Sequence, residues 1–323
     1  MRGILELVMN AAVNTFSYLP RMTAFNALPS RKTVLHYAAF KGQLSSVKAL
    51  VEAGADLDVT DENGVTPLHR AVIDGHSDVV QVLLEALCSV DKKDENGNSA
   101  LHEAAWSGYS KCVELLVKAR CNVNLHNRTG YTSLHLAAQN CHFKTVEALL
   151  KGGANPLAKN NYGDSPLHVA VRYGHVDVCK ILLANCQDNL SGQNNDGNTA
   201  LHIATSMGHE KVVDMLLNAG SKVATRNNVG DTARDIAIQN GFKTIAKKLA
   251  PANNKDNWKE ETHRSDPGLY LKSKTATSRH DKNAKKKKRH AAITTLVSHY
   301  HGAVVREHDN DGDNNDANLH IQQ

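Results

Sequence analysis

The organisation of this chain is visible in one stretch, Asp61-Glu62-Asn63-Gly64-Val65-Thr66-Pro67-Leu68-His69. Its last four residues follow a pattern of Thr or Ser, a variable residue, Leu and His. Six copies begin at Thr33, Thr66, Ser99, Thr132, Ser165 and Thr199, and a degenerate seventh begins at Thr232. Successive copies are 33 residues apart, except for one interval of 34. A fixed period of this length indicates a repeat architecture.

The residues around each tetrapeptide predict two short helices in every unit. A glycine precedes most of the tetrapeptides by two residues, where a tight turn requires positive φ. A second glycine, such as Gly75 or Gly108, is expected to end the first helix. Beyond it, apolar residues recur at the i, i+3, i+4 spacing of an amphipathic helix, as at Val80, Leu83 and Leu84.

One such unit cannot bury its own apolar face, so neighbouring units must stack into a one-dimensional solenoid. The combined pattern resembles the ankyrin repeat, and the resemblance covers residues 30–250. It implies an all-α array of about seven 33-residue helix-turn-helix units joined by hairpin loops. In the seventh unit, Arg234 and Asp235 stand where Leu and His are expected. A polar change of this kind suits the last unit of a stack, which no neighbour covers.

The segments that flank the array are expected to differ from it. Residues 1–29 form a separate segment in which 4–19 could form a helix that caps the stack. Only 12 of the 73 residues in 251–323 are Leu, Ile, Val, Phe, Tyr, Trp or Met, so this tail is predicted to be disordered. It contains a basic run of five residues, Lys285, Lys286, Lys287, Lys288 and Arg289.

We interpret this basic run first as a nuclear-import signal or a patch for acidic surfaces. One alternative is a basic amphipathic helix over 284–301 that binds a membrane or a calmodulin-like partner. The other is a run that only increases solubility.

Residue types that carry catalysis or bind metals occur here without the spacing that either function requires. Six of the 18 histidines belong to the repeated tetrapeptide, so we expect them to brace turns rather than share a metal. The six cysteines include no C-x-x-C pair and are expected to be reduced thiols. The aspartates around Gly312 do not fit a calcium loop. No enzyme motif is present, so we expect no catalytic site, cofactor, metal or small-molecule substrate.

Charge and hydropathy argue against two further classes of protein. The formal net charge is +5, divided into +2 for residues 1–250 and +3 for the remainder. A uniformly basic surface for nucleic acid is therefore not expected. No stretch approaches the roughly 18 consecutive apolar residues of a membrane-spanning helix. We expect a cytoplasmic or nuclear protein, and the sequence leaves its oligomeric state open.

Binding to another protein is the function that remains. Positions that change from unit to unit at the same phase are free to specify a partner, and in ankyrin arrays they line the concave face. Large side chains gather at such positions in the third to fifth units, at Trp106, Tyr131, Tyr162, Arg172 and Tyr173. Aromatic residues and Arg are common interface anchors. We expect these five residues to contact a protein segment, with Tyr131 and Tyr162 at the tips of turns. Their truncation should change the free energy of unfolding by less than about 0.5 kcal/mol.

Two finer expectations follow from resemblance. The stretch Asp94–Gly108 is similar to the arrays of diversin-type adaptors, which implies a role in Wnt-type signalling. Asn124 follows Val123, eight residues after Leu116, and so resembles the site that an asparaginyl hydroxylase modifies in ankyrin repeats. For the whole chain, the alternative to a protein-binding adaptor is a nuclear regulatory or nucleic-acid-associated factor that uses the basic tail.

Overall fold

The computed structural model describes residues 31–186 and 190–250, and this part of the chain consists of seven consecutive helix pairs. We number the pairs as repeats one to seven. The first helices are α2 (Val34–Phe40), α4 (Pro67–Ile73), α6 (Ala100–Ser107), α8 (Ser133–Gln139), α10 (Pro166–Tyr173), α12 (Ala200–Met207) and α14 (Ala233–Asn240). The second helices are α3 (Leu44–Glu52), α5 (Ser77–Glu85), α7 (Ser110–Lys118), α9 (Phe143–Lys151), α11 (Val176–Asn185), α13 (Glu210–Asn218) and α15 (Lys243–Lys248). The expected N-terminal cap and the expected disordered tail lie outside the described residues.

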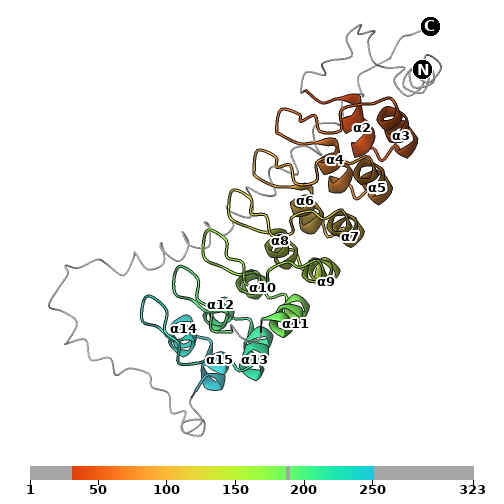
Figure 1. Ribbon diagram of the computed structural model, residues 1–323. Coiled ribbons are helices and arrows are strands. Elements are labelled where there is room, and N and C mark those ends of the chain that lie inside the picture. Colours follow the sequence, from red (N-terminus) through yellow and green to blue (C-terminus); the bar gives the residue numbers. More distant parts are fainter. Residues whose placement is uncertain (1–30, 187–189, 251–323) are drawn as a thin grey trace, which may run out of the picture. The chain divides into compact units, whose positions relative to one another are not determined.

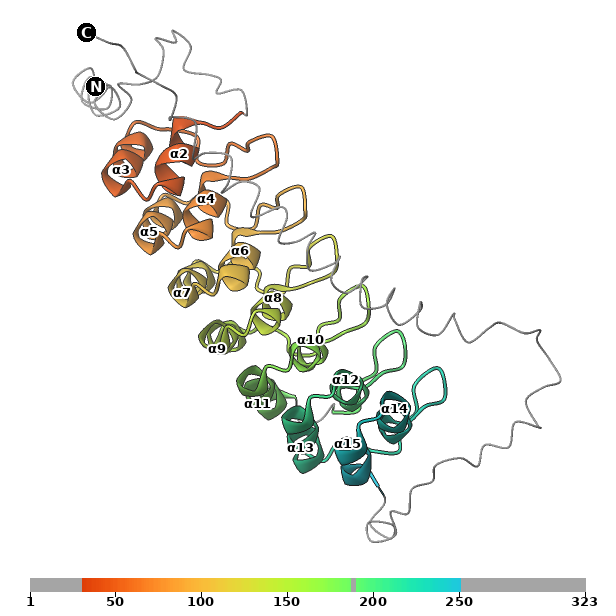
Figure 2. The same cartoon turned by 180° about the vertical axis from the view of Figure 1, so that it is seen from behind.

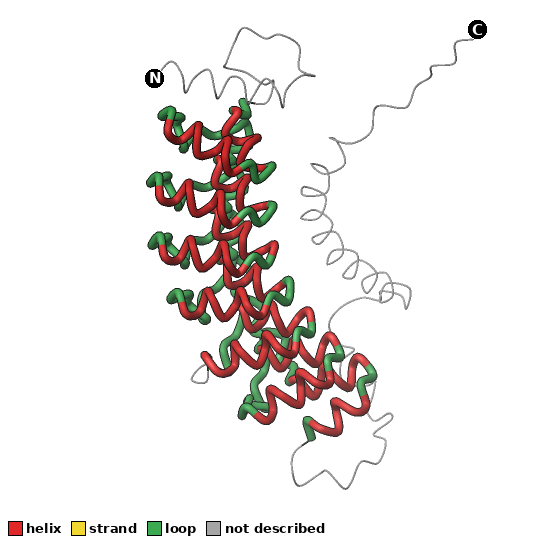
Figure 3. Tube along the Cα trace, turned by 90° about the vertical axis from the view of Figure 1, so that its right-hand side faces the viewer, coloured by secondary structure: helices red, strands yellow, loops and turns green. Residues whose placement is uncertain are grey.

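The repeats stack side by side. Each first helix packs against the first helix of the next repeat, and the second helices do the same. The loops that join one repeat to the next project beyond the first helices (Figures 1 and 2). We call each of these loops a finger and identify it by the helix that follows. The described residues form helices and loops (Figure 3), with isolated bridges at Lys93–Ser99 and Arg226–Thr232. The predicted all-α repeat array is confirmed.

In six repeats the backbone N–H of the first tetrapeptide residue donates to Nδ1 of the tetrapeptide histidine at the start of the first helix. In repeat two, Oγ1 of Thr66 accepts from the backbone N–H of His69 at 3.4 Å. The backbone N–H of Thr66 donates in return to Nδ1 of His69 at 3.3 Å. Because Nδ1 accepts a hydrogen bond, Nε2 carries the proton, and it donates to the carbonyl of Asn98 in the next finger at 3.2 Å. These histidines brace turns, as predicted, and they also join neighbouring repeats.

Both backbone conformation and space favour glycine after the first helix in most repeats. Gly108 follows α6 with a φ of +80°, and a Cβ there would lie 2.5 Å from Nδ1 of His142. His142 is held in place because its Nε2 donates to the carbonyl of Trp106 at 2.9 Å. The ring of Tyr109 packs against Gly75 in the corresponding position one repeat earlier. Tyr109 is therefore a scaffold residue.

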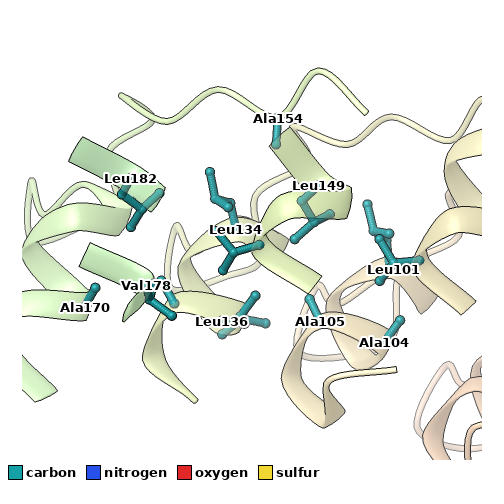
Figure 4. Packing of buried hydrophobic residues seen from close by; sticks show 14 of the residues in the cluster. Leu101, Ala104, Ala105, Leu134, Leu136, Leu149, Ala154, Ala170, Val178 and Leu182 are labelled. Atoms are coloured by element: carbon teal, nitrogen blue, oxygen red, sulfur yellow. The ribbon is translucent and has the colours of Figure 1, made fainter. Parts of the chain in front are cut away.

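The core is a continuous row of aliphatic side chains between the first and second helices. Leu101 of α6 and Leu134 of α8 point into it from successive first helices, and Leu149 and Leu182 enter from the second helices (Figure 4). Fully burying a leucine contributes about 1.5–3 kcal/mol. Ala105 is fully buried on α6, where its small side chain lets the neighbouring helix approach closely.

Repeat seven ends the array with a polar substitution that preserves the helix start. Asp235 replaces the tetrapeptide histidine, and its Oδ2 accepts from the backbone N–H and the hydroxyl of Thr232 at 2.9 and 2.7 Å. A carboxylate cannot donate to a following finger, and within residues 190–250 no finger follows. Ile238 is 51% exposed, whereas Thr205 at the same phase of repeat six is fully buried. The outer face of the last repeat is therefore only partly polar.

Two general expectations can be compared with the described residues. None of their helices is both long and apolar enough to cross a membrane. The six cysteines are free thiols, and five of them are buried. Burial raises the pKa of Cys88 and Cys179 to about 12. Cys141 is exposed, and with a φ of +62° it occupies the left-handed position where glycine follows the first helix in other repeats.

The buried tetrapeptide histidines predict that the array loses stability in mild acid. Burial lowers the pKa of His69, His102 and His135 from 6.5 to about 4. Between these values the unfolded chain binds protons that the folded chain excludes, so the free energy of unfolding falls as the pH falls. The expected slope is about 1.4 kcal/mol per pH unit for each histidine. Urea unfolding of the full chain at pH 7 and pH 5, followed by circular dichroism, measures it. A flat profile, or an unchanged slope in His102→Gln, would contradict this account.

Candidate protein-binding surface

Each finger turns around one Asp or Asn side chain. The six turn residues are Asp61, Asp94, Asn127, Asn160, Asn194 and Asn227. Oδ1 of the turn residue accepts from the backbone N–H groups two and four residues later. In the finger before α10, Oδ1 of Asn160 accepts from the N–H of Tyr162 at 2.9 Å and of Asp164 at 3.0 Å. These bonds fix the shape of the finger independently of the residue at its tip.

A second set of side-chain bonds links one finger to the next. Nδ2 of an Asn turn residue donates to the Asn or Asp that lies four residues after the turn residue of the preceding finger. We call this series of bonds the finger ladder. Its bonds are Asn127 to Asn98 at 3.0 Å, Asn194 to Asp164 at 2.8 Å and Asn227 to Asn198 at 3.0 Å.

The finger ladder is interrupted at repeat four. The residue that should accept from Asn160 is Tyr131, which has no amide or carboxylate oxygen to offer. Asn160 is only 5% exposed, and its Nδ2 has no hydrogen-bond partner. A buried donor without a partner destabilises a protein by about 1–3 kcal/mol. The backbone N–H of Tyr131 still donates to Oδ1 of Asn127 at 2.9 Å, so the turn itself is intact.

Four of the five predicted contact residues lie together around this interruption. The ring of Tyr131 is 5.5 Å from the imidazole of His135, whose Nε2 donates to the carbonyl of Asp164 at 3.0 Å. The pKa of Tyr131 is raised to about 12, first by burial and then by the nearby charges of Tyr173 and Asp164. The charge of Arg172 lowers the pKa of this hydroxyl, and the charge of Tyr162 raises it. The sequence thus selected positions that the fold brings to one surface of repeats four and five.

Arg172 is more constrained than its variable position suggested. Its Nη2 donates to Oδ2 of Asp164 at 2.5 Å, and the carboxylate is buried while the Arg172 side chain is 30% exposed. Sequence reasoning missed Asp164 because the same phase is occupied by Val65, Asn98 or Asn198 in other fingers. The sequence did contain a signal for this ion pair, namely an acidic residue in the finger immediately before a first helix that contains Arg.

The structure corrects two expectations about individual residues. Tyr131 was expected at the tip of a turn, but it lies at the base of its finger and packs partly buried against the core. Trp106 was expected to be free of the scaffold, but it is partly buried and packed against the same core. By contrast, Tyr162 is at the tip and 48% exposed, and Tyr173 ends α10 and is 37% exposed. The position of a residue within the repeat predicts the direction of its side chain, whereas the neighbouring side chains determine how deeply that side chain is buried.

Asn124 lies in the first part of the finger before α8, six residues after the end of α7. Its side chain is exposed, and Val123 before it is buried. Oδ1 of Asn124 accepts from the backbone N–H of Asn155 at 2.7 Å, and Nδ2 donates to the carbonyl of Gly153 at 3.2 Å. The predicted modification site is therefore accessible while it joins two repeats. The basic run Lys285–Arg289 lies outside the described residues and stays a prediction.

Known proteins share this pattern. A family model described as "Ankyrin repeats (3 copies)" matches residues 35–127, 101–191 and 186–260. One similar solved structure is the crystal structure of the ankyrin repeat domain of Bcl-3, described as a unique member of the IkappaB protein family. It is 30% identical with a TM-score of 0.62, and the match covers 67% of this chain and 98% of that chain. No curated protein sequence matched this chain.

The different burial of Trp106 and Tyr162 predicts that their truncation has different effects on the free energy of unfolding. Trp106→Ala should lower the free energy of unfolding by about 2 kcal/mol or more, because it removes a large ring packed against the core. Tyr162→Ala should change it by less than about 0.5 kcal/mol, because the ring is half exposed at a finger tip. Urea unfolding of the full-length variants measures both values. Equal effects would show that Trp106 does not contribute to the core.

The position of Asn124 predicts a selective modification. When the full chain is co-expressed with an asparaginyl hydroxylase, peptide mass spectrometry should find one added oxygen on the peptide that contains Asn124. Asn155 is the matched control, because it is also exposed but follows Ala154 instead of Val. An unmodified Asn124, or equal modification of both residues, would reject the assignment.

Proposed function

Because this chain belongs to the ankyrin-repeat family, we propose that it is an adaptor that binds a protein segment on the concave face of its array. Ankyrin repeats mediate protein–protein interactions, and the fold is typically a non-enzymatic interaction module. The observation that carries the proposal is the gathering of Tyr131, Tyr162, Arg172 and Tyr173 on one surface of repeats four and five.

The two outer tyrosines have properties of interface anchors. Tyr162 and Tyr173 remain 48% and 37% exposed, and other fingers and first helices adopt the same backbone without an aromatic residue at these positions. A partner that covers them would remove apolar area from water while leaving the hydroxyl groups free to form hydrogen bonds. Truncating an anchor of this kind weakens binding by about 2 kcal/mol or more.

Resemblance supports a finer assignment. The similarity of Asp94–Gly108 to diversin-type arrays favours an adaptor of Wnt-type signalling. The basic run Lys285–Arg289 favours import into the nucleus, so that the adaptor would work in the cytoplasm and the nucleus.

Loss of partners from the full chain tests the adaptor function. We expect proximity labelling in cells to return a set of proteins that is lost in the double variant Tyr162→Ala/Tyr173→Ala. Phe143→Ala is the matched control, because Phe143 is 47% exposed but starts the second helix α9. It should keep the same set. An unchanged set in the double variant would reject this surface. Salt-dependent binding of random DNA that persists without residues 30–250 would instead favour the nucleic-acid alternative.

A further inference from the structure

The interruption of the finger ladder and the candidate binding surface share one residue, Tyr131. In the fingers before α6, α10 and α12, the same position holds Asn98, Asp164 and Asn198, each of which accepts from the next finger. An Asn or Asp would therefore fit the backbone at position 131. Tyrosine at this position leaves Nδ2 of Asn160 buried without a partner. The scaffold alone gives no reason for this exception.

Tyr131 contributes to a surface whose charge differs from that of the first fingers. The fingers before α8 and α10, together with these two helices, contain four cationic residues, Arg120, Arg128, Lys159 and Arg172. Their single acid is Asp164, which is buried and paired with Arg172. The finger before α4 contains the opposite charge, with Asp56, Asp58, Asp61 and Glu62 and no Lys or Arg. These fingers and first helices of repeats four and five therefore carry a net positive charge, whereas the finger before α4 is negative.

The charge and the hydrogen-bond donors together indicate the chemistry of the partner. Tyrosine hydroxyls and a guanidinium donate hydrogen bonds, and carboxylates are acceptors that also complement positive charge. An acidic segment would be attracted to repeats four and five and repelled by the finger before α4. The surface thus fits one register of such a segment along the array.

We propose that Tyr131, Tyr162, Arg172 and Tyr173 bind an acidic peptide segment, and that Tyr131 is a specificity-determining residue retained although it interrupts the finger ladder. This inference rests on the proposed function, because it names the chemistry of the partner for the same surface.

The interruption is tested by stability alone, in a double-mutant cycle on the full chain. Asn160→Asp keeps the Oδ1 acceptor of the turn and removes the unpaired Nδ2 donor. In the wild-type background it should lower the Tm by less than Asn127→Asp does, since Asn127 loses a bond that it makes to Asn98. In the Tyr131→Asn background the ladder bond can form, so Asn160→Asp should become several degrees more destabilising. The same change in Tm in both backgrounds would overturn the ladder argument.

The partner is tested with peptides selected from a random-peptide display library on the immobilised full chain. We expect the selected peptides to be rich in Asp and Glu and to bind more weakly as ionic strength rises. Their affinity should fall at least tenfold in Tyr131→Asn and in Arg128→Glu. The matched charge change Lys144→Glu, on the second helix α9, should have little effect.

The possible results separate the two proposals. Peptides without excess acid that still lose binding in Tyr131→Asn would overturn the acidic segment and leave the binding surface intact. Peptides that are indifferent to Tyr131, Tyr162 and Tyr173 would overturn both the acidic segment and the proposed surface. Acidic peptides that require Arg128 but bind Tyr131→Asn equally well would overturn the role of Tyr131.

Discussion

The array depends on one histidine in each of the first six repeats, and this histidine uses both ring nitrogens. Nδ1 of His135 accepts from the backbone N–H of Thr132 at 3.1 Å and so helps to start α8. Nε2 of the same ring donates to the carbonyl of Asp164 at 3.0 Å, in the following finger. A local bond and a bond between repeats thus share one neutral, buried side chain. Because the second bond spans 29 residues in five of the six repeats, it holds successive fingers in the same register.

This register turns a sequence period into spatial neighbours. Residues at one phase of consecutive repeats form a row along the array, and the finger ladder is such a row of hydrogen bonds. The same geometry brings Tyr131 of one finger close to Tyr162 and Asp164 of the next, although 31 residues separate Tyr131 from Tyr162. A binding surface on this scaffold is therefore assembled from adjacent repeats, and a substitution at a position that belongs to both, such as 131, also acts on the ladder. Tyr131 illustrates the conflict, because its ring serves the surface and leaves the amide of Asn160 unpaired.

Local patterns in the chain were sufficient for the architecture. The 33-residue period predicted the array, and the tetrapeptide with its histidine and the glycines at positive φ, which each report on a few consecutive residues, predicted the turns and helix ends correctly. The polar start of repeat seven was also visible in the sequence, since Asp235 takes the place of the histidine in the bonds to Thr232 but cannot donate to a further finger. These features are local because helix starts and turns are determined by hydrogen bonds over three to five residues.

The phase of the repeats also placed Tyr162 and Tyr173 on the surface, but it did not predict how deeply each side chain lies. Trp106 and Tyr131 pack against the core, and Arg172 is held by Asp164, because side chains from the neighbouring repeat fill or leave the space around them. Nothing in the sequence of one finger shows that Asn160 will meet a tyrosine, since the partner position belongs to the previous finger. The amino-acid sequence thus specified the repeat and its solvent-facing positions. Packing between repeats alone decided which of those positions are free, because burial and pairing depend on the side chains of two repeats at once.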